Sequence, residues 1–161
     1  MRRLQLFHAN VGKRLVKSPK FYVRDSDLLH ALLGIPDRSA LFGRPVVGAS
    51  WEGFVIETLV ACAPDWSTSH FYRTSDGQEI DLLLELLGGA FWSIEVKRGR
   101  SPKVEAGFHR ACDSLKPARR FVVTSGKECY ALPQDIEAIG LYELATELAA
   151  LTTRLCKAAR N

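Results

Sequence analysis

Hydrophobic and polar positions change their period several times along the chain, and each change marks the boundary of a predicted element. Apolar residues spaced three to four apart predict helices over about residues 46–62, 103–115 and 144–155. Runs rich in Leu, Ile, Val and aromatic residues predict strands over about residues 70–74, 79–87, 91–98 and 119–126, with a short strand within 136–144. This order predicts an α/β fold in which helices flank a mixed central sheet on both faces.

The first 45 residues carry a weaker pattern. Five Lys or Arg residues among the first 17 favour a basic arm, as if the sequence were cut from something larger. Residues 21–34 predict a short strand and then a helix capped by Asp25 or Ser26 and ended by Gly34. We therefore expect an N-terminal arm with a short strand and helix over 1–45, and an α/β domain with a C-terminal helix over 46–161. The first 20 or so residues are expected to be loosely held or to pack on another chain.

Composition and charge narrow the class of protein. A chain of 161 residues with 47% hydrophobic and 25% charged residues suits one hydrophobic core. The net charge of +4 suits a polyanionic partner, although a balance this small also occurs in proteins that never bind nucleic acid. Four cysteines without C-x-x-C spacing argue against a zinc site and indicate a reducing cytoplasm. No apolar run of about 18 residues predicts a membrane helix.

Asp81, Glu95 and Lys97 stand in predicted strands that are otherwise strongly apolar. Charged side chains are seldom buried unless they pair with another charge or bind a metal. Because side chains alternate along a strand, the length of the connecting loop decides which residue faces Asp81. A two-residue Gly-Gly turn would set Asp81 opposite Val96, whereas a three-residue loop with a left-handed glycine would set it opposite Glu95 or Lys97. The adjacent glycines favour the odd loop and hence one polar cluster.

Four segments of the chain resemble a known family in their order and spacing. They are KRLVKSPKFYVRDSDLLHALLG, WEGFVIETLV, FYRTSDGQEIDLLLE and WSIEVKRG. The series Glu52, Asp81, Glu95-Val96-Lys97 resembles the PD-(D/E)XK nuclease superfamily. The four segments together are similar to the domain of unknown function found C-terminal to the ATPase module of many prokaryotic AAA-type proteins. This resemblance covers roughly residues 12–143 and implies a restriction-endonuclease-like core of a helix, three strands, a helix and a strand.

The sequence departs from that family in two places. It has Asp25-Ser26-Asp27-Leu28 where the family more often has Asp-Thr-Gly-Leu, and it lacks the G-x-x-x-x-G-K-[ST] motif of an ATPase. The chain is thus expected to be a C-terminal piece of an AAA-type protein or a stand-alone relative of that domain.

A site of this kind would hydrolyse a phosphodiester with the help of Mg²⁺ or Mn²⁺. These hard cations prefer oxygen ligands, so Asp81 and Glu95 are predicted to bind the metal, with the backbone carbonyl of Val96 as a further ligand. Lys97 is predicted to orient or deprotonate the attacking water and to balance charge. Glu52, from the preceding helix, is predicted to complete or tune the site.

Basic and polar residues near the site are predicted to contact DNA phosphates. Arg73 and Gln78 lie in or beside the strands, and Arg98, Arg100 and Lys103 follow the Glu-x-Lys motif. The predicted partners are therefore DNA and an attached or separate ATPase module. A membrane is not expected, and the sequence leaves open whether the chain forms a homodimer.

Simpler interpretations remain open for each of these residues. Asp81 and Lys97 can form a cross-strand ion pair on a partly solvated face, and Glu52 can be a solvated acid at the rim of its helix. The expected structural residues are Glu57, Glu79 and Glu85 as solvated or paired acids, the four histidines, and Trp51, Trp92 and Phe108 in the core. The function is accordingly either a metal-dependent nuclease or a non-catalytic module that keeps the nuclease-like fold and binds an ATPase.

Overall fold

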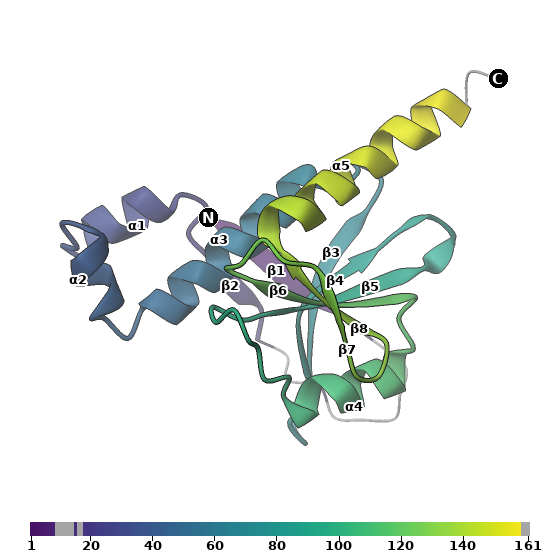
Figure 1. The fold of residues 1–161 in the computed structure, drawn as a ribbon, viewed down its shortest axis with the longest axis horizontal. Coiled ribbons are helices and arrows are strands. Elements are labelled where there is room, and N and C mark those ends of the chain that lie inside the picture. Colours follow the sequence, from purple (N-terminus) through teal and green to yellow (C-terminus); the bar gives the residue numbers. More distant parts are fainter. Residues whose placement is uncertain (9–14, 16–17, 159–161) are drawn as a thin grey trace.

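A mixed sheet forms the centre of the molecule. The computed structural model describes residues 1–8, 15 and 18–158, and within them the sheet has eight strands in the order β2-β1-β3-β4-β5-β6-β8-β7 (Figure 1). The strands are β1 (Arg2–Leu6), β2 (Lys20–Tyr22), β3 (Thr68–Arg73), β4 (Glu79–Glu85), β5 (Phe91–Val96), β6 (Arg119–Thr124), β7 (Tyr130–Leu132) and β8 (Ile136–Gly140). The pairs β1–β3, β5–β6 and β6–β8 are parallel and the other neighbours antiparallel. The predicted α/β fold with a mixed sheet is confirmed.

Helices cover both faces of this sheet. They are α1 (Ser26–Leu32), α2 (Arg38–Phe42), α3 (Val47–Cys62), α4 (Ala106–Leu115) and α5 (Leu141–Ala158), with a 3-10 turn η1 (Leu87–Gly89) between β4 and β5. α3 and α5 pack together on one face and α4 lies on the other, while α1 and α2 project sideways near the start of α3 (Figure 1). Within the described ranges, no helix is long and apolar enough to cross a membrane.

Only part of the apolar surface of α3 is buried. Val55, Ile56 and Leu59 are fully buried against the sheet and α5. Trp51 is only partly buried and Phe54 is 47% exposed. The predicted core position of Trp51 is therefore only partly right, because α3 packs against the sheet and α5 at once and leaves the Trp51–Phe54 flank open. Trp92 and Phe108 are buried as predicted.

The N-terminal strand β1 belongs to the central sheet. Leu4 and Leu6 are 1% and 5% exposed and pack in the core between the sheet and α3. The Arg2 guanidinium binds the Glu57 carboxylate of α3, with Nη2 2.9 Å from Oε1. The prediction of a loosely held N-terminus is thus wrong for residues 2–6, because two alternating leucines are enough to bury one face of a short strand. The rest of the predicted arm, residues 9–14 and 16–17, lies outside the described residues.

The hairpin between β4 and β5 has the predicted odd loop. Leu86 N–H donates to the Ala90 carbonyl at 2.8 Å, which closes a three-residue loop over η1. Gly88 and Gly89 have φ of +78° and +74°, a left-handed conformation that glycine adopts without steric cost. The paired residues include Leu82 opposite Ile94, so the register leads toward Asp81 opposite Glu95.

Candidate functional site

A lysine from β2 lies among three carboxylates. Lys20 Nζ is 3.1 Å from Glu52 Oε1, from Glu79 Oε1 and from Asp81 Oδ1. Glu52 comes from α3 and the other two acids from β4, so one ammonium group joins three elements. The Lys20 side chain is only 16% exposed, which removes most of the solvent screening from these contacts.

Two further side chains hold these carboxylates in place. Tyr22 donates its hydroxyl hydrogen to Glu52 Oε1 at 2.6 Å, and the Arg73 guanidinium donates to Glu79. Lys20 and Tyr22 stand two residues apart, so the short strand β2 presents both on the same side.

A β-bulge in β4 positions Asp81. Two steps along β3, from His70 to Tyr72, correspond to three steps along β4, from Leu83 to Ile80. Leu83 and Ile80 both pack in the core on the α4 side, although regular alternation puts residues three apart on opposite faces. The extra residue re-aims Asp81 toward Lys20, as bulges beside functional sites commonly do. A prediction that assumes regular alternation of side chains along β4 does not include this bulge, and so it does not give the direction of Asp81.

The Asp81 side chain also accepts a backbone hydrogen bond from β5, beyond the point where the backbone pairing of β4 with β5 ends. The backbone pairing of β4 with β5 ends at Leu82 opposite Ile94, and beyond it Val96 N–H donates to Asp81 Oδ2 at 3.0 Å. With Lys20 on Oδ1, both carboxylate oxygens have partners. The contact that Val96 makes here is through its N–H group, whereas its carbonyl was the predicted metal ligand.

Glu95 and Lys97 form an ion pair at the end of β5. Lys97 Nζ is 3.0 Å from Glu95 Oε1 and 3.6 Å from Glu105 Oε1, just before α4. The backbone carbonyl of Lys97 accepts a hydrogen bond from the Trp51 indole at 3.3 Å. Lys97 therefore pairs with Glu95, and Asp81 pairs with Lys20, in place of the cross-strand Asp81–Lys97 pair considered above. We refer to Glu52, Glu79, Asp81 and Glu95 as the acid cluster.

Burial and the charges of neighbouring acids make ionisation of Asp81 and Glu95 costly. Burial raises the pKa of Glu95 to about 7, the charge of Asp81 adds to the rise, and Lys97 opposes it. Burial and the charge of Glu52 likewise raise the pKa of Asp81, against the effect of Lys20. Burial acts to lower the pKa of Lys20, but the charges of Asp81, Glu52 and Glu79 outweigh it and raise this pKa. Lys20 thus stays protonated and supplies the positive charge that the acids need.

The donor set suits a hard divalent cation. Among the residues that the structure describes, no three His, Cys, Asp or Glu side chains form a ready-made metal centre. Mg²⁺, however, commonly takes only one or two carboxylates and completes its shell with water and substrate phosphate. Asp81 and Glu95 are two such carboxylates, although both oxygens of Asp81 have partners here, Lys20 and the N–H group of Val96.

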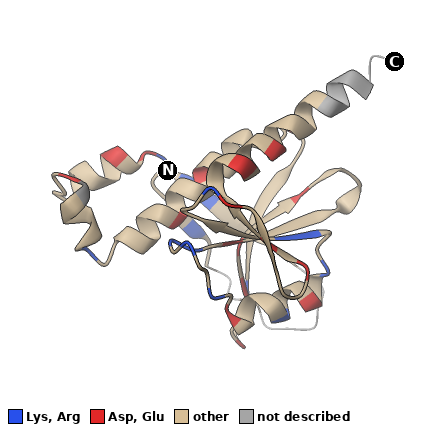
Figure 2. Cartoon of the chain, viewed as in Figure 1, with Lys and Arg blue, Asp and Glu red and all other residues tan. Residues whose placement is uncertain are grey.

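The residues predicted to bind phosphate fall into two groups. Arg98, Arg100 and Lys103 are exposed and follow β5, where phosphate has access to them. Gln78 is 1% exposed and accepts a hydrogen bond from Ser114, so it lies in the interior, where phosphate has no access. Arg73 is engaged with Glu79. Lys and Arg are interleaved with Asp and Glu over several elements (Figure 2), so local geometry matters more than overall charge.

Lys20 and Tyr22 were not assigned a role from the sequence. The sequence feature that could have indicated them is the alternation in β2, where Lys20 and Tyr22 flank Phe21. Phe21 is 58% exposed, so the other face of this strand is polar. Nothing in that pattern says which residues the face meets. Glu79 and Glu57 were expected to be solvated or paired, and the structure pairs both, Glu79 with Lys20 and Glu57 with Arg2 and Arg24.

Comparisons with known proteins place this chain among domains without an assigned function. Residues 47–144 match the family described as Domain of unknown function (DUF4143), and residues 1–39 match Domain of unknown function (DUF8612). Two relatives, Uncharacterized protein Rv2008c of Mycobacterium tuberculosis and Uncharacterized protein Mb2031c of Mycobacterium bovis, are each 40% identical over 147 residues. The alignments cover 91% of this chain and 33% of each relative. No solved structure matches this chain.

The match to the first family spans more than half of the sequence and includes α3, β3, β4, β5, α4, β6 and β8. It thus contains every member of the acid cluster together with Lys97. The chain spans about a third (33%) of the length of each of these two relatives. On this basis the chain belongs to the DUF4143 family of domains.

Proposed function

We propose that this chain is a metal-dependent nuclease domain of the PD-(D/E)XK type that hydrolyses phosphodiester bonds of DNA. The observation that supports the proposal is the position of Asp81 and Glu95 on the neighbouring strands β4 and β5, with Lys20 3.1 Å from Asp81 and Lys97 3.0 Å from Glu95. A partly buried and a buried carboxylate beside two lysines offer oxygen ligands and cations at one place. Perturbed carboxyl groups of this kind are common at catalytic sites.

Each residue of the proposed site has a defined task. A bound Mg²⁺ or Mn²⁺ supplies Lewis acidity and a more acidic water. Asp81 and Glu95 hold the cation, and Lys97 orients the attacking water and balances the negative charge that develops on the phosphate. Glu52 and Glu79, which already contact Lys20, would keep its ammonium in place if Asp81 held a metal. Arg98, Arg100 and Lys103 contact flanking phosphates.

One observation favours a second function, a non-catalytic interaction module. Lys20 already satisfies Glu52, Glu79 and Asp81 at 3.1 Å, so the cluster has its positive charge without any metal. Such a cluster can serve to hold β2, β4 and α3 together while another surface binds a partner. The first function requires that a divalent cation competes with Lys20, and the second requires that it does not.

Calorimetric titration of the protein with Mg²⁺ and with Mn²⁺ tests the proposal. The variants are Asp81→Asn, which removes a ligand charge, and Lys97→Met, which keeps both ligands. Glu137→Gln is the control, since Glu137 is also an acid in a strand that pairs with a basic residue, here Arg119, and it does not belong to the acid cluster. The same four proteins are incubated with supercoiled plasmid and with a linear DNA, with metal and with EDTA.

We expect wild type, the control and Lys97→Met to bind metal and Asp81→Asn to bind it at least about tenfold more weakly. Cleavage is expected only with metal, in wild type and control, and not in Asp81→Asn or Lys97→Met. Absence of metal binding by the wild type, or cleavage that survives Asp81→Asn, would overturn the proposal and leave the interaction module.

The same proposal extends to the setting of the domain. We infer that it works in the cytoplasm and is attached to, or binds, an AAA-type ATPase. Free cysteines at positions 62, 112 and 129 suit a reducing compartment. The relatives are longer than this chain, which covers 33% of them, so there is room in such proteins for a further module. Co-purification of the domain with an ATPase of its own cell would test this point, and exclusive recovery of the domain alone would count against it.

A further inference from the structure

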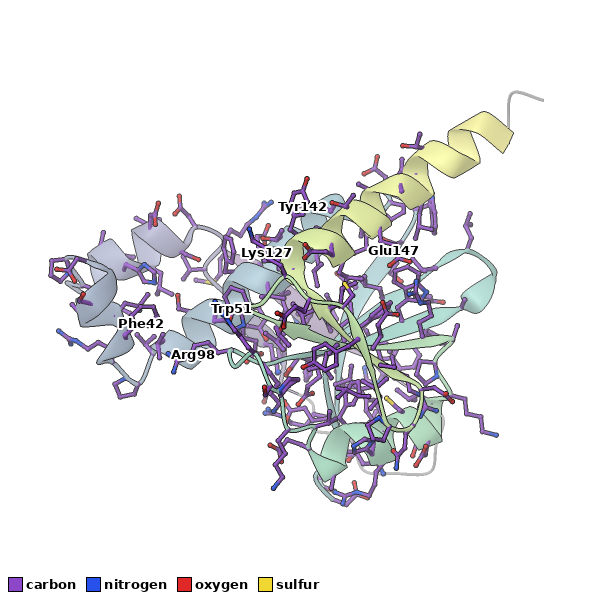
Figure 3. The ribbon with its side chains drawn as sticks, in the orientation of Figure 1. Phe42, Trp51, Arg98, Lys127, Tyr142 and Glu147 are labelled. Atoms are coloured by element: carbon purple, nitrogen blue, oxygen red, sulfur yellow. The ribbon has the colours of Figure 1, made fainter. Side chains whose placement is uncertain are left out.

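A cavity of about 960 Å³ lies beside the acid cluster, between α1, α2, the start of α3 and the segments that follow β5 and β6. Figure 3 shows Phe42, Arg98 and Trp51 along this side of the molecule. We propose that the cavity takes one unpaired nucleotide of a single-stranded DNA. This inference rests on the proposed function and specifies the substrate class of the same site.

Trp51 connects the cavity to the backbone of Lys97. Trp51 lines the cavity and is the neighbour of Glu52 in α3, and its indole donates to the carbonyl of Lys97 at 3.3 Å. Arg98 and Arg100, which also line the cavity, follow Lys97 directly along the chain. We therefore expect the phosphate of a nucleotide held here to lie on the Arg98 side of the cavity, toward Lys97, where hydrolysis is proposed.

The wall combines the groups that a nucleotide needs. Trp51 and Phe42 offer aromatic surface on which a base can stack, and Arg98 lies over the Phe42 ring with 6.0 Å between the guanidinium carbon and the ring centroid. Phe42 is 57% exposed, so an aromatic ring stands at the mouth of the cavity. The exposed arginines Arg98 and Arg100 attract phosphate.

The polar part of the wall fixes the orientation of the nucleotide. His30 Nε2 and Ser50 Oγ are 2.7 Å apart, and because Ser50 is 5% exposed and His30 is partly buried, they place a hydrogen-bonded polar pair in the wall. Asp27 and Asp37 line the side formed by α1 and α2, where Asp37 caps α2. Negative charge on that side directs phosphate to the arginine side and leaves the base between the aromatic rings and the polar pair.

The size of the cavity suits an unpaired nucleotide. Cavities of about 300–1,000 Å³ hold single small molecules, so this one, at about 960 Å³, has room for a nucleotide. A base that enters it must be out of its stack, and unstacking costs least in a strand that is already single. The same aromatic and basic groups recur where proteins bind single strands without sequence preference.

Binding of a fluorescently labelled oligothymidylate in EDTA tests the inference without hydrolysis, measured by anisotropy for the whole chain. The variants are Phe42→Ala and Arg98→Ala, both at exposed positions. The matched controls are Trp66→Ala and Lys116→Ala, an exposed aromatic and an exposed basic residue, neither of which lines this cavity or the adjoining one at α5 that shares Trp51 with it. Thermal melting of each variant checks the fold, and Arg98→Ala carries the test if Phe42→Ala does not fold.

We expect the single strand to bind and each cavity variant to bind about tenfold more weakly, with both controls unchanged. An unlabelled duplex of the same sequence is expected to compete at least tenfold less well than the unlabelled single strand. Equal competition by duplex, or equal losses in controls and cavity variants, would overturn the inference. If the strand binds as expected but metal-dependent cleavage is absent, the proposed hydrolysis fails and the cavity assignment stands. If cleavage occurs and the cavity variants bind like wild type, the cavity assignment alone fails.

Discussion

The ammonium of Lys20 lies 3.1 Å from Oδ1 of Asp81, in the place where a cation bound to this carboxylate would be expected. These residues are 61 positions apart, on strands β2 and β4 that are not neighbours in the sheet. The contact gives the acid cluster a positive charge that is part of the chain. Any divalent cation that binds Asp81 must therefore displace Lys20, and this competition can be measured.

Lys20→Met should weaken the metal-free protein and strengthen metal binding. The variant leaves Glu52, Glu79 and Asp81 without their shared cation, and removing one partner of a buried ion pair costs about 3 kcal/mol of the free energy of unfolding. Affinity for Mg²⁺ should rise by about tenfold or more, because a unit charge close to the metal has been removed. Chemical denaturation and calorimetry measure the two effects. Lys103→Met, at an exposed lysine, is the control. Equal metal affinity in wild type and Lys20→Met would show that no cation competes with Lys20.

Glu95 should make the stability of the metal-free protein depend on pH. Its pKa in the folded protein is about 7, above its ordinary value of 4.5, so the folded state holds this proton more tightly than the unfolded state. The stabilisation is fully present below about pH 4.5 and is lost as the pH rises through 7, with a total of about 2–3 kcal/mol. Glu95→Gln should lack this part of the pH dependence. Denaturation of both proteins at intervals from pH 5 to 8 gives the comparison, and parallel curves would contradict the shift.

Gly107→Ala should destabilise the protein because there is no space for a side chain. A Cβ at this position in α4 would lie 2.4 Å from the Gly77 carbonyl oxygen, which belongs to the backbone of the β3–β4 turn. We expect a loss of about 2 kcal/mol or more in the free energy of unfolding. Gly48→Ala in α3 is the matched control, since a Cβ there meets nothing within 4 Å. It should stabilise the protein by up to about 1 kcal/mol. Similar melting temperatures for the two variants would contradict the close contact.

Leu4→Ala should lower the free energy of unfolding by about 2–4 kcal/mol, because Leu4 is 1% exposed within the core. Gln5→Ala, at the adjacent exposed position, should change it by less than about 0.5 kcal/mol. A negligible loss in Leu4→Ala would mean that β1 is not part of the folded sheet in solution.

The sequence by itself determined those elements whose hydrophobic period is long and regular. α3, α4, α5 and the strands from β3 to β6 lie where their apolar spacing predicts them, and the odd loop at Gly88 and Gly89 follows from local glycine chemistry. Local patterns are sufficient there, because side-chain period and turn conformation depend on neighbours in the chain. The sequence did not predict β1, because a pattern of five residues with two leucines is too short to be distinguished from a polar arm.

Only the tertiary structure decided how the charges are paired. The bulge that turns Asp81 depends on the register of β4 against β3, and the choice of Lys20 as its partner depends on β2 reaching α3 and β4 across the sheet. The sequence marks Asp81, Glu95 and Lys97 as unusual, because apolar neighbours surround them. Which cation neutralises which acid is a property of distances between segments far apart in the chain, and Coulomb energy depends on those distances and on burial rather than on sequence order.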